Sequence, residues 1–425
     1  MAKWYKQYNP VPLIKELEKS RSINNEGNVQ FSGFGIMTAL PKLEAMICLN
    51  QEITLEDKHG IVQQSIFNVG RRGELLSENI LTEINRLEKD YLSFREQNYI
   101  LATSLSIDNC YHKLSSLQID NNRITFSASL PKSFAKSISS QQDIKFFAGG
   151  KEIPPKYLYV RIAVRAKSIY RATEKALNSL NVFRGLLNYA VNYGQQSFSF
   201  GETSRKPINK ILLGPIHTLH KPNGKIDIDV FWFEEGYRAP VQPYYDNSLR
   251  RYGDKTVKRF DEILKFAHGI RKNIKKSKIS KKLLDALLLY NDALDNYDYE
   301  VSYIKLWAVL ELLTATGQED GYKVTVRRAA FIFSNPEVEK VHLELLRDFR
   351  NELVHRGHRN AKLEIFVYDL KLYVERLLHF LIFNYSKFSS FDDVGYLLDR
   401  TTNLEELSRK VKLVNFAKKL NRHRK

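Results

Sequence analysis

The chain has 425 residues, enough for two or three domains that each bury a core of their own. Hydrophobic residues make up 43% of it and charged residues 27%, a balance that excludes disorder over most of the length. Cys48 and Cys110 stand far apart, which excludes a disulfide framework and a cysteine zinc site. The chain has no run of about 18 apolar residues, and residues 1–10 lack an apolar signal core. We therefore expect a cytoplasmic protein that does not use a membrane.

The first 245 residues predict a mixed α/β region. Helical spacing of apolar residues over 75–97 and 168–187 alternates with β-rich segments at 99–107, 157–164 and 226–233. Residues 117–130 predict two short strands around the turn-forming trio Asp120-Asn121-Asn122.

Two pairs of residues in this region could hold a metal ion. Asp227 and Asp229 lie on one expected strand, as paired carboxylates do in magnesium nucleases, but a solvent-facing strand edge explains them better. His217 and His220 have ligand-like spacing, yet two ligands do not make a site, and surface histidines are the favoured interpretation. We expect no metal and no cofactor.

From residue 246 onward the pattern becomes all-helical. We expect a basic helical connector at 246–282, a helical bundle at 283–390 and a basic C-terminal tail at 391–425. Within them, helices are predicted at 252–270, 279–297, 299–315, 324–333, 338–355 and 361–385. Short polar connections between these helices suit antiparallel neighbours. The fold class is therefore α+β, with an N-terminal mixed α/β domain followed by a C-terminal all-α bundle.

The formal charge of +18 is concentrated in two segments. Residues 250–282 hold thirteen lysines and arginines against three acids, and residues 409–425 hold eight against none. Localised positive charge attracts a polyanion by counterion release, so we expect RNA binding. A solvated helix with a frayed basic tail is the alternative. The residues we expect to bind nucleic acid are Arg271, Lys272, Lys275 and Lys276.

A possible catalytic motif lies near the end of the helix expected at 338–355. Arg350 and His355 form an Arg-x4-His pair, and Asn351 follows the arginine directly. Spacing alone is a weak signal in a chain with many arginines and ten histidines. The order of neighbouring segments adds to it: a preceding helix ends in an apolar run with Glu311, and a shorter helix between the two carries Arg327 and Arg328. Over about 280–390 this ordered set resembles the HEPN superfamily, and within it the Apea-like branch of prokaryotic defence proteins.

The resemblance implies a metal-independent endoribonuclease that works as a homodimer, most simply an anti-phage toxin of abortive infection. Residues 1–245 would then be a sensor or regulatory region, and a phage-derived trigger or an antitoxin would be a further partner. His355 would exchange protons near neutral pH, and Arg350 would bind phosphate oxygens. Asn351, one turn before His355 on the same helix face, would orient the histidine or a phosphate oxygen. Glu311, Arg327 and Arg328 would support the site, with Glu311 paired to one of the arginines.

Geometry and an alternative function qualify this expectation. Side chains five positions apart point about 140° away from each other on an ideal helix, so Arg350 and His355 converge only if the helix loosens or a second subunit completes the site. Alternatively, His355 is an inert residue at a helix end and Arg350 pairs with Glu311 or Glu352. The chain would then be a non-catalytic RNA-binding or partner-binding dimerisation module.

Overall fold

In the computed structural model, the residues described are 1–32, 35–108, 114, 116–139, 157–196, 207–233, 254–316, 321–356 and 363–422. Only the backbone is described at 139, 227–233, 254–259, 322, 355, 356 and 422. The chain divides into two compact units. Unit 1 comprises residues 1–105, 109–180 and 214–241, and unit 2 comprises 106–108, 181–213 and 242–425.

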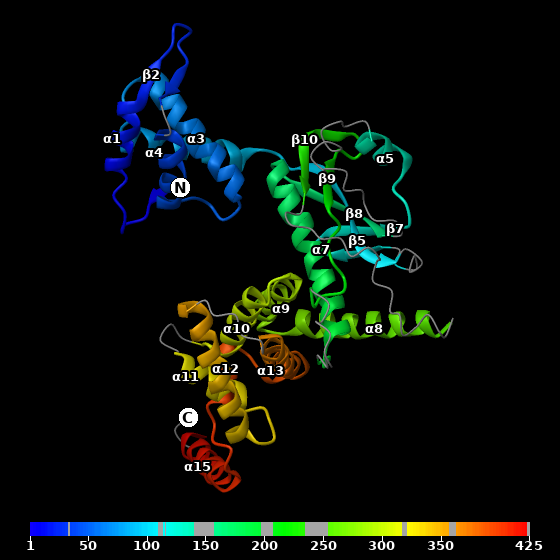
Figure 1. Cartoon of the computed structure of the whole chain (residues 1–425). Coiled ribbons are helices and arrows are strands. Elements are labelled where there is room, and N and C mark those ends of the chain that lie inside the picture. The colour runs from blue at the N-terminus through cyan, green and yellow to red at the C-terminus, as the bar shows by residue number, and fades with distance from the viewer. Residues whose placement is uncertain are drawn as a thin grey trace. The chain divides into compact units, whose positions relative to one another are not determined.

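Unit 1 begins with helices α1 to α4 and the short strands β1 to β4 (Figure 1). Two small antiparallel pairs, β1 with β4 and β2 with β3, connect the helices. The elements are β1 Lys3–Trp4, α1 Val11–Ser20, β2 Arg21–Ile23, β3 Val29–Phe31, α2 Gly35–Met46, β4 Ile47–Cys48, α3 Leu55–Arg72 and α4 Ser77–Ser93.

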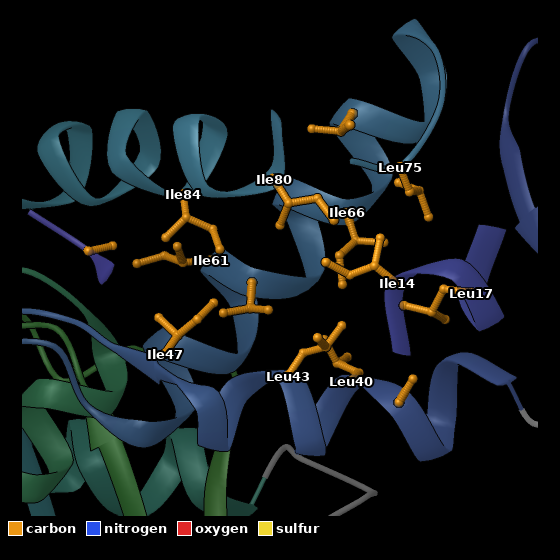
Figure 2. Close-up of a cluster of buried hydrophobic side chains, with 14 of the residues drawn as sticks. Ile14, Leu17, Leu40, Leu43, Ile47, Ile61, Ile66, Leu75, Ile80 and Ile84 are labelled. Carbon is orange, nitrogen blue, oxygen red and sulfur yellow. The ribbon is translucent and has the colours of Figure 1, made fainter. Parts of the chain in front are cut away.

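A continuous apolar cluster holds these helices together. Figure 2 shows side chains from α1, α2, α3 and α4 meeting in it, with Ile47 of β4. Leu17, Leu43, Ile66 and Ile80 have no exposed surface. Burying an aliphatic side chain of this kind contributes about 1.5–3 kcal/mol. The cluster therefore stabilises the packing of these four helices against one another.

A six-stranded sheet follows, in the order β10-β9-β5-β8-β7-β6. The pairs β10–β9, β9–β5, β8–β7 and β7–β6 are antiparallel. The elements of this part are β5 Gln97–Asp108, β6 Ser116–Ile119, β7 Asn122–Ser127, α5 Lys132–Ser139, β8 Tyr157–Ala166, α7 Ile169–Asn192, β9 Ile216–His220 and β10 Ile226–Phe233.

The strands and the turn predicted from the sequence are confirmed here. Along β8, every second residue from Leu158 to Ala166 is buried, as alternation requires. The β6–β7 hairpin turns at Asp120 and Asn121, whose φ angles are +47° and +67°. Two successive positive φ angles define the turn whose twist matches paired strands, and Asp and Asn tolerate that conformation best among residues with side chains.

Unit 2 is helical, and the six helices expected between residues 252 and 385 match observed ones to within a few residues, apart from α8. That helix runs six residues beyond its expected end. The helices are α8 Asp254–Lys276, α9 Ser280–Asp295, α10 Tyr299–Thr314, α11 Tyr322–Ala330, α12 Pro336–Arg356, α13 Leu363–Phe383, η3 Tyr385–Lys387, α14 Phe391–Leu398 and α15 Leu404–Arg422 (Figure 1). Helix α10 packs on α9 and α13, and α11 packs on α12 and α14.

The division between the units differs from the boundary expected at residue 245. Residues 181–213 group with the helical elements, so α7 begins in unit 1 and ends in unit 2. Its second half carries polar residues that bind unit 2 partners: Arg184 pairs with Asp295 at 2.7 Å, and Asn188 donates to Asn291 Oδ1 at 2.9 Å. Asn209 also donates to Asp295 at 2.8 Å. Buried amides need such partners, and these partners lie in the last turns of α9.

The bundle also extends beyond its expected end at residue 390, so the segment 391–425 is not simply a tail. Helix α14 buries Val394 and Leu398. Its start has a capping box in which the Ser390 hydroxyl accepts from the Asp393 N–H and the Asp393 carboxylate accepts from the Ser390 N–H. Among the described residues, none of the helices combines the length and apolarity needed to cross a bilayer.

Candidate functional site in the helical unit

Helix α12, which carries the Arg-x4-His motif, is anchored at its C-terminal half by α10 and α13. Pro336 opens the helix, where its missing N–H removes no hydrogen bond. The Tyr303 hydroxyl of α10 donates to the Leu346 carbonyl at 2.7 Å. The Phe349 ring lies 5.2 Å from the Tyr303 ring and 4.7 Å from the Phe366 ring. These contacts fix the rotation of α12 just before the motif.

The structure brings Arg350 and Asn351 together at this point. The Arg350 Nη1 donates to the Asn351 Oδ1 at 3.3 Å, and both side chains are half-buried. The backbone of His355 lies in the last turn of α12, but its side chain lies outside the described residues. Gly357 and the segment that follows, up to residue 362, also lie outside them. The convergence of Arg350 and His355 therefore stays a prediction.

The expected pairing of Glu311 with an arginine is not found among the described residues. The Glu311 Oε1 instead accepts from the Trp307 indole, one turn earlier on α10, at 2.8 Å. Arg328 is 5% exposed and binds both carboxylate oxygens of Asp399, at 2.9 and 2.7 Å. It also donates to the Thr314 carbonyl at 2.6 Å, and Arg327 binds the same carboxylate at 2.5 Å.

These contacts give the two arginines a structural role. Arg328 joins the end of α10 to the residue that follows α14, so it holds α14 on the bundle. The two guanidinium groups lower the pKa of Asp399, with Arg328 as the larger cause. The predicted pairing of Glu311 with an arginine is wrong because the Trp307 indole N–H satisfies Glu311, and the acid that binds the arginines, Asp399, lies some seventy residues further along the chain.

A buried ionic cluster on α13 was missed from the sequence. Lys371 and Glu375 are both 0% exposed and pair at 2.8 Å. The Lys371 ammonium also donates to the carbonyls of Asn192 and Gln195, at 2.8 and 2.9 Å. Glu375 accepts from the Gly194 N–H at 2.9 Å and from the Tyr290 hydroxyl.

Every polar atom of this pair is satisfied, so the cluster acts as a brace. All three N–H donors of the ammonium are used, one by Glu375 and two by the carbonyls of Asn192 and Gln195. These carbonyls lie at and just after the C-terminus of α7, where a positive charge is favourable. Burial lowers the pKa of Lys371 and raises the pKa of Glu375. The sequence did hold a signal for this pair. Lys371 and Glu375 are four positions apart on a helix that is apolar all round, a pattern that predicts a buried ion pair.

The residues expected to bind nucleic acid lie on α8. Lys272, Lys275 and Lys276 are exposed, and their spacing places them on one face together with Lys265. Arg271 is half-buried and lies one turn before Lys275, at the edge of this face beside the buried side of the helix. The opposite side of α8 is anchored by Ala267, Ile270 and Ile274, which are buried.

Helix α15 carries the second basic segment. Every side chain from Val411 to Asn421 is exposed. Isolated helices of this length are marginally stable in water, so such a helix gains from a partner that covers it. Its exposed apolar residues are Leu404, Val411, Leu413, Val414, Phe416 and Leu420.

Neither metal-site alternative gains support. His217 and His220 are buried in β9, at 1% and 0% exposure, so the surface interpretation was wrong. The His217 Nδ1 lies 2.7 Å from the Thr103 hydroxyl, and the His220 Nδ1 lies 3.0 Å from the Gly224 carbonyl. The side chains of Asp227 and Asp229 lie outside the described residues. In the described part of the chain, three or more potential ligands do not gather anywhere.

Comparisons of the chain with protein-family models, with curated proteins and with solved structures find no match. Membership of the HEPN superfamily therefore stays a prediction from the motif and from the order of the helices.

Proposed function

We propose that the chain is a metal-independent endoribonuclease of HEPN type, acting as an anti-phage effector of abortive infection. The observation that carries the proposal is the motif's position at the anchored end of α12, where Arg350 contacts Asn351 and His355 follows one turn later. A chain with a lysine face on α8 has the charge needed to approach RNA.

The reaction needs three groups that this motif can supply. The RNA 2′-oxygen attacks the adjacent phosphorus, the 5′-oxygen leaves, and a 2′,3′-cyclic phosphate remains. His355 takes up the 2′-hydroxyl proton or protonates the leaving oxygen. The Arg350 guanidinium stabilises charge on the phosphorane oxygens, and Asn351 orients it through their hydrogen bond.

One histidine cannot conveniently serve as both acid and base, so the active form is a homodimer with two motifs at one cleft. An exposed apolar stripe on α12 supports a contact through this helix. Val338, Val341 and Leu345 recur at helical spacing and are 45%, 64% and 56% exposed. Mixing His355→Ala subunits with wild type should lower activity by more than the mutant fraction. A strictly proportional loss, or full activity of a monomer in light scattering, would exclude the dimeric site.

The decisive experiment compares purified wild type, His355→Ala and a matched control, His342→Ala. His342 lies on the same helix, is exposed, and contacts Glu339 only at 3.7 Å. With a fluorescent RNA substrate in EDTA, His355→Ala should lose roughly 10²–10⁴-fold in rate while His342→Ala cleaves normally. A DNA copy of the substrate should stay intact, because it lacks the attacking hydroxyl. Equal cleavage by both variants at equal thermal stability would refute the catalytic assignment, and activity that requires Mg²⁺ would favour a metal nuclease.

A second candidate function is a non-catalytic RNA-binding or partner-binding dimerisation module. It is favoured by the exposed basic faces of α8 and α15, which need no reaction to explain them. Under this alternative, RNA binds with salt-dependent affinity in a gel-shift assay and is recovered uncut from wild type and from His355→Ala.

A further inference from the structure

A cavity of about 850 Å³ opens on unit 1, beside the sheet. Its walls are the start of β5, the β6–β7 turn, the end of β8 and the N-terminal half of α7. Cavities of 300–1,000 Å³ are the usual size for small-molecule sites. No residue of this cavity takes part in the proposed cleavage of RNA.

The cavity wall carries an excess of positive charge. Four cations line it against two acids, Glu96 and Asp120. The cations come from three separate elements: Arg123 from β7, Arg165 from β8, and Arg171 and Lys175 from α7. Side chains from different elements face one space only because the fold brings them there, unlike charges along a single solvated helix.

The acids do not neutralise these cations. Lys175 pairs with Glu96 at 3.1 Å, and Arg165 approaches the same carboxylate only to 3.9 Å. Arg171 pairs with Glu174 at 2.6 Å. Within the described part of the chain, the side chain of Arg123, which also lines the cavity, has no ion-pair or hydrogen-bond partner. At least two guanidinium groups are therefore available to an anion.

The walls are fixed in place by hydrogen bonds between elements. The Asn122 amide donates to the Ser179 hydroxyl at 2.8 Å, which ties the β6–β7 turn to α7. The Lys175 ammonium donates to the Arg165 carbonyl at 2.9 Å, which ties α7 to β8. These bonds hold the backbone segments that carry Arg123 and Arg165, so only the two side chains have to become ordered when an anion binds.

Neutral hydrogen-bonding groups line the remaining wall. Asn98, Asn121 and Asn178 line the cavity, and their side-chain amides make no hydrogen bonds among the described residues. An amide offers both a donor and an acceptor, which suits the hydroxyls and ring edges of a sugar or a base. Phosphate oxygens suit the guanidinium groups, whose planar forks bind them in pairs.

We propose that this cavity binds a small phosphorylated molecule of nucleotide size, with its phosphates on Arg123 and Arg165 and its polar remainder among the asparagines. The site would give unit 1 a ligand of its own, and its occupancy can be measured without any assay of RNA cleavage.

The test is titration calorimetry on the full chain with ADP, inorganic pyrophosphate and adenosine as probes. ADP should bind saturably, pyrophosphate more weakly, and adenosine not measurably. The Arg123→Ala/Arg165→Ala double variant should weaken ADP binding at least about tenfold, because charge-assisted hydrogen bonds to two guanidinium groups are lost. Arg71→Ala is the matched control; Arg71 is exposed in unit 1 outside the cavity and makes one hydrogen bond, at 3.4 Å to Asn28.

The double variant should keep the wild-type melting temperature, since in the described residues neither arginine side chain makes a hydrogen bond or an ion pair shorter than 3.9 Å. Absence of binding by both ADP and pyrophosphate at millimolar concentration would overturn the proposal, as would ADP binding that the double variant leaves unchanged. A 2′-O-methyl RNA oligonucleotide serves as a final probe. Binding of that oligonucleotide alone, lost in the double variant, would assign the cavity to nucleic acid and also overturn the proposal.

Discussion

Replacing Lys371 by Met tests whether the buried pair on α13 braces unit 2. The substitution keeps a long unbranched side chain but removes the ammonium that binds Glu375 and two carbonyls at the end of α7. The carboxylate would remain, fully buried, with only the Gly194 N–H and the Tyr290 hydroxyl as donors.

The expected loss of stability is large. Breaking a buried ion pair from one side typically costs 3–5 kcal/mol, because the remaining charge is left uncompensated. For a unit of this size that corresponds to a fall in melting temperature on the order of 10 °C. Burial already raises the pKa of Glu375, and without the lysine that pKa rises further. A folded-state pKa above the unfolded value lowers stability as pH rises, so the loss should be greater at pH 8 than near pH 5.

Calorimetry of wild type, Lys371→Met and Lys371→Met/Glu375→Met at several pH values provides the measurement. The double variant should recover part of the loss and should lose the pH dependence of the single variant. Lys387→Met is the matched control, since Lys387 is exposed in η3 and its ammonium makes no hydrogen bond or ion pair among the described residues. A loss below about 1 kcal/mol for Lys371→Met, or a loss that does not change with pH, would refute the reasoning.

Three further predictions concern RNA binding and stability. Replacing Lys272, Lys275 and Lys276 by Ala should weaken RNA binding and flatten its dependence on salt in filter binding, whereas an unchanged slope would assign the lysine face to another partner. Deleting residues 404–425 should leave the melting temperature within about 2 °C, because α15 is exposed from residue 411 onward, and a larger fall would show that it packs on the bundle. The Arg86 guanidinium is the main cause that holds the pKa of Glu83 at about 2 instead of 4.5. The lowered pKa stabilises the fold above pH 4.5, and this stabilisation is lost as the pH falls toward 2. In calorimetry, Glu83→Gln should therefore lose less stability than wild type between pH 4.5 and pH 2. The same dependence of melting temperature on pH in both proteins would contradict the prediction.

Local structure was largely predictable because it depends on residues close together in the chain. The spacing of apolar residues and the positions of turn-forming residues predicted three features correctly. These are the alternation along β8, the positive-φ turn at Asp120 and Asn121, and the approximate limits of the helices from α9 to α13. The lysine face of α8 also follows, once its helical period is known. For the candidate site, the same reasoning placed the motif near the C-terminal end of a helix, where α12 ends at Arg356, but it did not predict the hydrogen bond between Arg350 and Asn351.

Partnerships between distant residues were decided only by the tertiary structure. The period of a helix shows which face is apolar but not which element covers it, so nothing local linked Arg328 to Asp399 or Arg184 to Asp295. For the same reason, two histidines that looked like surface residues proved to be buried in β9. A buried ion or amide is stable only when packing supplies its partners, and those partners are separated from it by tens to nearly two hundred residues. The brace between Lys371, Glu375 and the end of α7 exists only because folding brings those segments into contact.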